Sequence, residues 1–222
     1  MQLRAHFWRL REKVKARLMG DKYLPAVFSS IYRSNAWADQ ESRSGTGSNR
    51  AATQQIRQSL PDLFRRRQIS TLLDAPCGDF NWMAELVPHL ENYYGVDIVP
   101  ELIRENQTRH QRKQIHFQCA NLVTDPLPRA DLVLCRDCFI HLSTNLIWSS
   151  LNNFKKTGAR YLLLSQQNED ITYLDIVPGS WRPINFHKPP FNFPKPLEVI
   201  PEDAQGTRQL CLWELDKLQV KS

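Results

Sequence analysis

Side chains that can do chemistry follow two apolar runs of the sequence. In LLDAPCGDFNW, residues 72–82, Asp74 comes directly after a pair of leucines. In DLVLCRDCFIHLS, residues 131–143, Asp137 and His141 follow a second apolar stretch. A carboxylate accepts hydrogen bonds or balances a positive charge, and a histidine with a pKa of about 6.5 can take up a proton near neutral pH. We therefore expect the chemistry of this protein at these two segments.

The elements that must position these segments are short apolar runs separated by stretches of helical length. Runs of this kind lie at residues 70–75, 93–98, 115–120, 131–136, 160–165 and 209–215. Strands with helix-length spacers predict βαβ units and a parallel sheet, and such sheets bind ligands at the carboxyl ends of their strands. Both chemical segments should therefore border one pocket.

The other segments are less regular. Residues 20–49 read as irregular and end in the polar stretch WADQESRSGTGSN, whereas residues 50–60 are good helix formers. Ser48 or Asn49 can cap that helix, and Pro61 is expected to end it or to open the next one. We divide the chain into a basic helix and cap segment, residues 1–49, and an α/β domain, residues 50–222.

Length and composition fit one α/β domain with a sizeable core. No apolar stretch approaches the roughly 18 residues of a membrane-spanning helix, and charges interrupt the N-terminus where a signal peptide would be apolar. These observations predict a cytoplasmic protein. Five cysteines, an odd number, predict reduced thiols. Cys135 and Cys138 have no second Cys or His pair at zinc spacing, so no metal site is expected.

The formal charge of +6 is concentrated at the N-terminus. Residues 1–20 carry six basic side chains against the single acid Glu12, and their apolar residues have helical spacing. This pattern predicts an amphipathic helix with a basic outer face. The helix either docks on the domain or makes a weak, reversible contact with acidic lipid or an acidic partner. The rest of the chain is nearly neutral, which argues against nucleic acid as a partner.

The turn after residue 74 and a second acid describe a nucleoside site. Asp97 ends the second apolar run, 19 positions after Gly78, where an acid can bind ribose hydroxyls. A dinucleotide fingerprint requires three glycines, but only Gly78 is present, and Asp74 and Asp79 would repel a pyrophosphate. A nucleoside that carries a cationic sulfonium and an amino group suits this turn better. S-adenosylmethionine is such a compound.

The four segments LLDAPCGDFNW, YYGVDIVPELI, DLVLCRDCFIHLS and GARYLLLS resemble the successive motifs of class I S-adenosylmethionine-dependent methyltransferases, over roughly residues 68–216. The resemblance implies a Rossmann-like α/β fold with a seven-stranded, mostly parallel sheet and helices on both faces. It also implies an antiparallel last strand, which QLCLWEL would provide. Trp37, SGTGS, DAPCGDFNWM and CRD are similar to a bacterial subgroup of unassigned substrate.

The resemblance also implies which residues contact the cofactor. The first motif would surround the methionine portion, Asp97 would bind the ribose and Ile98 would flank the adenine. Asn121 stands where many members have an aspartate for the adenine amino group, and Pro76 stands where many have glycine. The cofactor-binding residues expected on this basis are Asp74, Ala75, Pro76, Cys77, Gly78, Asp97, Ile98, Asn121 and Arg136.

Methyl transfer needs a positioned nucleophile and, for a hydroxyl or an amine, a base. His141 is the candidate base, and Asp137, four positions earlier, would orient it or the substrate. Arg136 would pair with an acid or hold a carboxylate of the substrate. The segment of residues 177–196, rich in proline and phenylalanine, is expected to form a lid, or else a stiff connection packed on the domain. The substrate-binding residues expected are Trp37, Ser44, Ser48, Trp82, Trp181 and Phe191.

These expectations combine into a methyltransferase that acts on an oxygen or nitrogen nucleophile of a small molecule. Two alternatives stay open. One is an RNA or protein methyltransferase, which the nearly neutral body and the absence of an N-P-P-Y-like motif disfavour. The other is a catalytically silent module that binds a nucleoside or a partner on the same fold. The sequence gives no indication of the oligomeric state.

Overall fold

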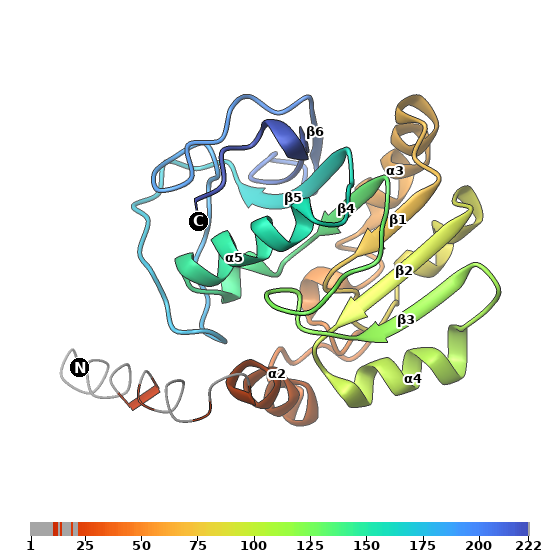
Figure 1. Cartoon of the computed structure of the whole chain (residues 1–222), viewed down its shortest axis with the longest axis horizontal. Helices are drawn as coiled ribbons and strands as arrows, with labels where there is room; N and C mark the ends of the chain where they lie inside the picture. Colours follow the sequence, from red (N-terminus) through yellow and green to blue (C-terminus); the bar gives the residue numbers. More distant parts are fainter. Residues whose placement is uncertain (1–10, 13, 15–18, 20–21, 222) are drawn as a thin grey trace.

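Short apolar runs form the strands of a seven-stranded sheet at the centre of the computed structural model, which describes residues 11–12, 14, 19 and 22–221 (Figure 1). The strand order is β3-β2-β1-β4-β5-β7-β6. The strands are β1 (Thr71–Asp74), β2 (Asn92–Asp97), β3 (Ile115–Cys119), β4 (Leu132–Cys135), β5 (Tyr161–Gln167), β6 (Glu198–Pro201) and β7 (Arg208–Glu214).

The direction of the strands agrees with the sequence-based expectation. Strands β1 to β5 pair in parallel, and β7 runs antiparallel to both β5 and β6. The expected α/β fold with an antiparallel late strand is therefore confirmed. Strand β6 was not predicted, because it is a four-residue edge strand that ends in a proline and carries little pattern. Strand order reverses at β1, which pairs with β2 on one side and β4 on the other.

Successive residues of the strands face opposite sides of the sheet, and each side is covered. Leu72, Leu132 and Leu134 pack with α3 (Gln54–Arg67) and α4 (Pro100–His110). Leu73 and Val133 pack on the other side with α5 (Thr144–Lys155) and the start of α2 (Tyr23–Ser34). This two-residue period is that of a sheet buried on both faces.

Three local predictions were wrong. Residues 23–34 form the helix α2 rather than irregular chain, because Tyr23, Leu24 and neighbours at helical spacing bury one face. Pro61 lies inside α3 and does not end it, since packing of the apolar side chains on both sides of Pro61 outweighs the lost hydrogen bond. The β1–β2 connection contains two 3-10 turns, η3 (Met83–Glu85) and η4 (Val87–His89), and no α-helix.

The segment of residues 177–196 mostly packs on the domain instead of forming a lid. Phe186, Phe191 and Phe193 are buried in an aromatic cluster with Trp148 and Trp213, with ring centroids 4.9 Å apart for Phe186 and Phe191. The expectation that Phe191 contacts substrate is therefore wrong, because its ring fills the core. The alternative, a stiff connection against the domain, is correct for these residues.

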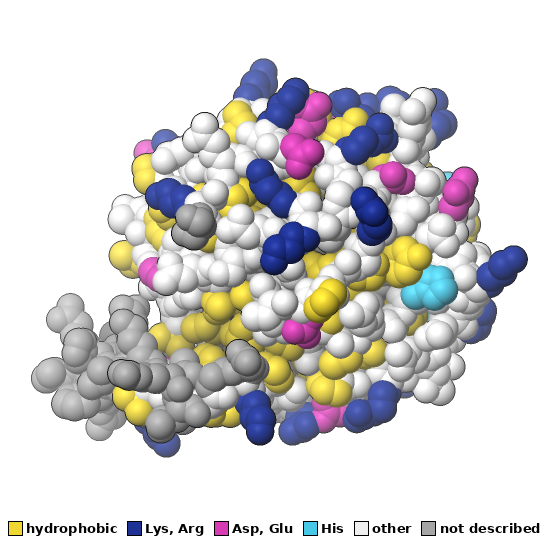
Figure 2. Space-filling model, viewed as in Figure 1, with side chains coloured by type: hydrophobic (Ala, Val, Ile, Leu, Met, Phe, Trp, Pro, Cys, Tyr) yellow, Lys and Arg dark blue, Asp and Glu magenta, His cyan; other side chains and the backbone are white. Residues whose placement is uncertain are grey.

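Most of the expected basic helix of residues 1–20 lies outside the described residues, of which only 11–12, 14 and 19, all helical, fall in this segment, and its lipid or partner contact stays a prediction. Within the residues that are described, no helix is long and apolar enough to span a membrane. On the face drawn in Figure 2, Lys and Arg side chains are spread among Asp and Glu and do not form one continuous stripe.

Candidate functional site

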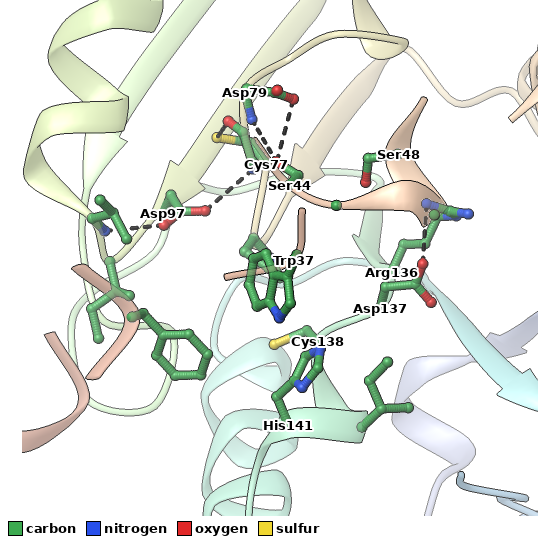
Figure 3. A pocket seen from close by; sticks show the side chains of 18 of the residues that line it. Trp37, Ser44, Ser48, Cys77, Asp79, Asp97, Arg136, Asp137, Cys138 and His141 are labelled. Carbon is green, nitrogen blue, oxygen red and sulfur yellow. Dashed lines mark hydrogen bonds and ion pairs between the residues drawn. The ribbon is translucent and has the colours of Figure 1, made fainter. Parts of the chain in front are cut away.

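A cavity of about 380 Å³ lies at the carboxyl ends of β1, β2 and β4 (Figure 3). It is within the size range of small-molecule sites. Most of the residues expected from the sequence line it, although they come from segments far apart in the chain. The expected residues that line the cavity are Trp37, Ser44, Ser48, Asp74, Pro76, Cys77, Gly78, Trp82, Asp97, Ile98, Asn121, Arg136, Asp137, His141 and Trp181. Ala75 and Phe191 are buried and do not line it.

Asp97 stands at one end of the cavity, with Asp137 at the other end in the view of Figure 3. Oδ2 of Asp97 accepts a hydrogen bond from the Gly78 amide at 3.2 Å, and Oδ1 of Asp97 accepts one from the Val99 amide at 3.0 Å. A carboxylate has about four lone-pair sites, and these two amides together with that of Ile98 do not fill all of them, so the group can also accept from a ligand. Burial raises the pKa of Asp97 to about 6. The group is therefore mostly ionised at pH 7.

The turn that faces Asp97 requires glycine at position 78. Gly78 has φ 54°, and a Cβ there would lie 2.2 Å from Ser44 Oγ. Asn106 donates to the Gly78 carbonyl at 2.8 Å and fixes the turn from α4. The backbone of the turn therefore comes closer to residue 44 than any side chain would permit.

Residues 42–48, which we call the strap, cross the cavity and are held by Asp79. Its carboxylate accepts the Ser42 hydroxyl at 3.1 Å and the Arg43 amide at 2.7 Å, and its own amide donates to Ser44 Oγ at 3.0 Å. The hydroxyl of Ser44 is therefore engaged within the protein. Asp79 serves as the anchor of the strap, a role that its position in the sequence did not indicate.

We expect Asp79→Ala to release the strap. Trypsin should then cleave after Arg43 several-fold faster than in the native chain, because the backbone there loses its acceptor. Asp62→Ala is the control, because it removes an exposed carboxylate of the helix α3 that makes no contact with the strap. Equal cleavage rates at Arg43 in the native protein and in Asp79→Ala would contradict the anchoring role.

The other end of the strap contacts the turn that follows β4. A Cβ on Gly47 would lie 2.6 Å from Asp137 Oδ2 and 3.3 Å from Arg208 Nη2. These two atoms form an ion pair at 2.8 Å. The strap therefore joins the turn after β1 to the turn after β4, and a side chain at position 47 would have to displace the Asp137 carboxylate.

Asp74 lies between the two ends of the cavity and is almost fully buried. The Tyr93 hydroxyl donates to its Oδ2 at 2.8 Å. Burial raises the pKa of Asp74 to about 7, and the charge of Asp97 contributes in the same direction. Near neutral pH this carboxyl is therefore partly protonated.

This raised pKa predicts a stability change for Asp74→Asn. Because the folded-state pKa lies above the unfolded value, protonation of Asp74 favours the folded state, and this contribution is lost as pH rises through about 7. The variant carries no charge and still offers an oxygen to Tyr93. We expect it to be about 2–4 kcal/mol more stable than the native protein at pH 8, with little difference at pH 4. Urea unfolding at both pH values checks this, and an equal difference at both would contradict it.

Four charged side chains form a network at the opposite end. Arg136 Nη2 binds Glu202 Oε2 at 2.6 Å, and both side chains are buried. Asp137 Oδ2 contacts Arg136 Nη1 at 3.3 Å and Arg208 Nη2 at 2.8 Å. Burial opposes ionisation of Asp137, but the two guanidinium groups outweigh it and lower its pKa. Arg136 was expected to pair with an acid or to hold a carboxylate of the substrate, and in the structure it pairs with the acids Glu202 and Asp137.

Two of the residues in this network have further features. Asp137 has φ 49°, a backbone conformation that residues other than glycine rarely adopt, and its amide donates to Ser165 Oγ at 2.8 Å. The guanidinium of Arg136 lies over the Trp82 ring, 5.6 Å from its centroid. Trp82 therefore lines the cavity and also packs on the buried cation.

His141 ends the 3-10 turn η5 (Phe139–His141) and stacks on Trp37, with ring centroids 5.3 Å apart. Its Nδ1 lies 2.9 Å from the Ser180 carbonyl oxygen. Since a carbonyl only accepts, Nδ1 carries the proton and Nε2 has the free lone pair. Burial lowers the pKa of His141, so the ring is neutral at pH 7. Ser180, and not Asp137, orients this imidazole, because Asp137 binds the two arginines.

Several residues of the cavity were missed by sequence reasoning. Leu24, Phe28 and Tyr32 of α2 line it, and their four-residue spacing was a usable signal. Arg208 and Gln167 also line it, but no local pattern marks them.

Among the described residues, no group of three or more His, Cys, Asp or Glu side chains is arranged to hold a metal ion. The cysteines that the structure describes are all free thiols.

Comparisons with known proteins agree with the fold. Residues 72–159 match the family model described as a methyltransferase domain. A comparison with curated protein sequences finds no match.

Solved structures with a similar chain trace include N-methyltransferase NodS from Bradyrhizobium japonicum WM9 in complex with S-adenosyl-L-homocysteine, at a TM-score of 0.50 and 16% identity, covering 62% of this chain and 73% of that one. Magnesium protoporphyrin IX methyltransferase from Synechocystis PCC 6803 has a TM-score of 0.45 and 21% identity, covering 54% of this chain and 61% of that one. The methyltransferase domain of bacterial CtHen1 has a TM-score of 0.47 and 18% identity, covering 53% and 67%. The family match covers residues 72–159, less than half of the 222-residue chain, and the similarity to these solved structures shows the fold alone.

Proposed function

We propose that this protein is an S-adenosylmethionine-dependent methyltransferase that methylates an oxygen or nitrogen atom of a small molecule. The observation that carries the proposal is the single cavity that joins Asp97 to His141 at the carboxyl edge of the sheet. One end offers carboxylate acceptors for a sugar, and the other offers a neutral imidazole. The match to a methyltransferase domain over residues 72–159 supports the same reaction.

The residues at the Asp97 end fit the nucleoside part of the donor. The Asp97 carboxylate lines the cavity and can accept hydrogen bonds from ribose hydroxyls. Asn121 Oδ1 accepts the Val123 amide at 3.0 Å and keeps its second lone pair for an adenine amino group. The β1–β2 connection has no α-helix whose N-terminus would bind a pyrophosphate. These features favour a nucleoside without phosphates.

S-adenosylmethionine, when bound, supplies a methyl group on a positively charged sulfur. Acidic side chains near the turn after β1, among them Asp74 and Asp97, complement that charge. The strap and Trp37 line the cavity and would limit the access of water to a bound ligand. His141 accepts at Nε2 the proton of the O–H or N–H group that becomes methylated, while its Nδ1–H stays hydrogen-bonded to the Ser180 carbonyl.

A small acceptor is favoured by the shape of the site. The cavity is bordered by Trp37, His141 and the exposed ring of Trp181, which together form an aromatic rim. Flat rings and sugars pack well on such surfaces, whereas a nucleic acid is bound through many cations that contact its phosphates.

The test is a calorimetric titration of the full chain with S-adenosylmethionine, and with NAD as a pyrophosphate-containing control. Binding of S-adenosylmethionine without binding of NAD is expected. A panel of phenols, carboxylic acids and amines is then screened for formation of S-adenosylhomocysteine. No binding of S-adenosylmethionine would overturn the proposal. Binding with turnover only on RNA or protein would replace the small acceptor, and binding without any turnover would point to the silent module.

A further inference from the structure

Arg182 is a buried cation that pairs with no carboxylate of the described residues. Only 4% of the surface of this residue is exposed, and its Nε has no hydrogen-bond partner. Nη1 donates to the Phe139 carbonyl at 3.2 Å and Nη2 donates to the Tyr173 hydroxyl at 2.6 Å. The guanidinium also lies over the Tyr173 ring, 4.8 Å from its centroid. Burying an arginine without an anionic partner is costly, so its position calls for an explanation.

The contacts of Arg182 converge on the turn that carries His141. Besides the bond to Phe139, the Arg182 amide donates to the Ile140 carbonyl at 3.0 Å. The Gly179 amide donates to the His141 carbonyl at 2.9 Å, and the Ser180 carbonyl faces His141 Nδ1 at the same distance. Residues 179–182 are therefore fastened to residues 139–141 by four hydrogen bonds, two of which come from Arg182.

We propose that Arg182 is the positioning residue for His141: it clamps residues 179–182 onto the 139–141 turn, so that the Ser180 carbonyl accepts a hydrogen bond from Nδ1–H and Nε2 keeps its lone pair. The use of Nε2 as a base rests on the proposed function. The clamp itself is a property of the chain that can be measured without any substrate.

A neutral imidazole free in water exchanges between two tautomers, and only one of them leaves Nε2 able to accept a proton. A fixed carbonyl next to Nδ1 selects that tautomer. If residues 179–182 moved away from the turn, the carbonyl would no longer be aligned and the selection would be lost. The position of the Arg182 guanidinium thus determines which tautomer the His141 ring adopts.

The charges around His141 act in both directions. The carboxylate of Asp137, four residues before His141, favours the imidazolium, whereas the guanidinium of Arg182 disfavours it. Asp137 is in turn neutralised by Arg136 and Arg208. Trp37, which stacks on the ring, carries no charge.

The experiment is nitrogen-15 NMR of the histidine rings in the full chain at a pH where they are neutral, with the His141 signals assigned by comparison with His141→Asn. The native protein should show His141 with the proton on Nδ1. Arg182→Lys keeps the charge but lacks the planar fork, and it should lose this signature and show the averaged shifts of a histidine in water. Tyr173→Phe removes the hydroxyl partner of Arg182, and it should show a smaller change in the same direction.

Two controls separate a positioning effect from general damage. Arg160→Lys alters an arginine that also donates to a backbone carbonyl and lies over a tyrosine ring, but at the start of β5. His187, whose Nδ1 faces the Phe193 carbonyl, is an internal reference that should stay unchanged in every variant.

An Nδ1-protonated His141 in folded Arg182→Lys would overturn the proposal. If Arg182→Lys does not fold, unchanged His141 shifts in Tyr173→Phe would overturn it alone. Calorimetric titration of the same variants with S-adenosylmethionine reports on the proposed function separately. If Arg182→Lys loses the selection of the tautomer but still binds S-adenosylmethionine, the clamp is supported. If the native protein selects the tautomer but does not bind S-adenosylmethionine, the clamp is kept and the proposed methyltransferase function is rejected.

Discussion

Replacing Asp97 with alanine should reduce the affinity for S-adenosylmethionine about 100-fold or more. The variant removes a carboxylate that would accept two ribose hydroxyls, and each hydrogen bond to a charged group contributes about 1.5–3 kcal/mol. It also leaves the amides of Gly78 and Val99 without their acceptor, so the turn that faces the ligand loses its support. Calorimetric titration of folded protein measures the change.

Asp131→Ala is the matched control for this experiment. Asp131 also accepts backbone amides, those of Ser70 and Thr71, both at 2.9 Å, but it does so at the amino end of the sheet. It should lower stability and leave donor affinity unchanged. Unchanged affinity in folded Asp97→Ala would remove this residue from the binding site.

The pH dependence of donor binding gives a second check on Asp97. Its pKa of about 6 in the free protein means that the carboxylate gains a proton as pH falls through that value. A protonated carboxyl is a weaker acceptor and carries no charge to complement a sulfonium. Affinity should therefore fall as pH is lowered from 7.5 to 5, and Asp97→Ala should lose this part of the dependence.

The second large effect is expected for His141→Ala, which should lower kcat about 100-fold or more, the range for loss of a general base. Donor affinity should change little, because the Asp97 end of the cavity is untouched. The measurement is S-adenosylhomocysteine formation with an acceptor that the native protein methylates. Activity of the native protein should fall as pH drops below the pKa of His141, which burial holds under its ordinary value.

His187→Ala is the control for His141, since that ring also faces a backbone carbonyl but does not line the cavity. Equal turnover in the native protein and His141→Ala would exclude the ring as the base. Loss of donor affinity that accounts for the whole loss of activity would reassign His141 to binding.

The sheet and most of the cavity could be predicted from sequence because both depend on local patterns. A run such as LLDA shows a strand by its apolar residues, and the parallel arrangement then places the residue after each strand at one edge. For this reason Asp74, Asp97 and Asp137, at or just after three different strands, were expected together and lie around one cavity.

What could not be predicted depends on contacts between distant residues. Arg208 reaches Asp137 from 71 positions away, and Asp79 binds the strap across about 36 positions. Phe191 was assigned to substrate because an aromatic residue in a proline-rich loop has no local signal that distinguishes a core side chain from an exposed one. The helix α2 was missed although its four-residue spacing was present, because it was read together with the irregular polar stretch that follows it up to residue 49.

The strap has a consequence for how the protein can be divided. Its residues lie before the helix α3 and well before residue 72, where the match to the methyltransferase domain begins. A fragment that starts at residue 50 would retain all seven strands but would lack Trp37 and the whole strap. Such a fragment would be missing one wall of the cavity, so the part of the chain that forms the cavity is larger than the region matched by the family model.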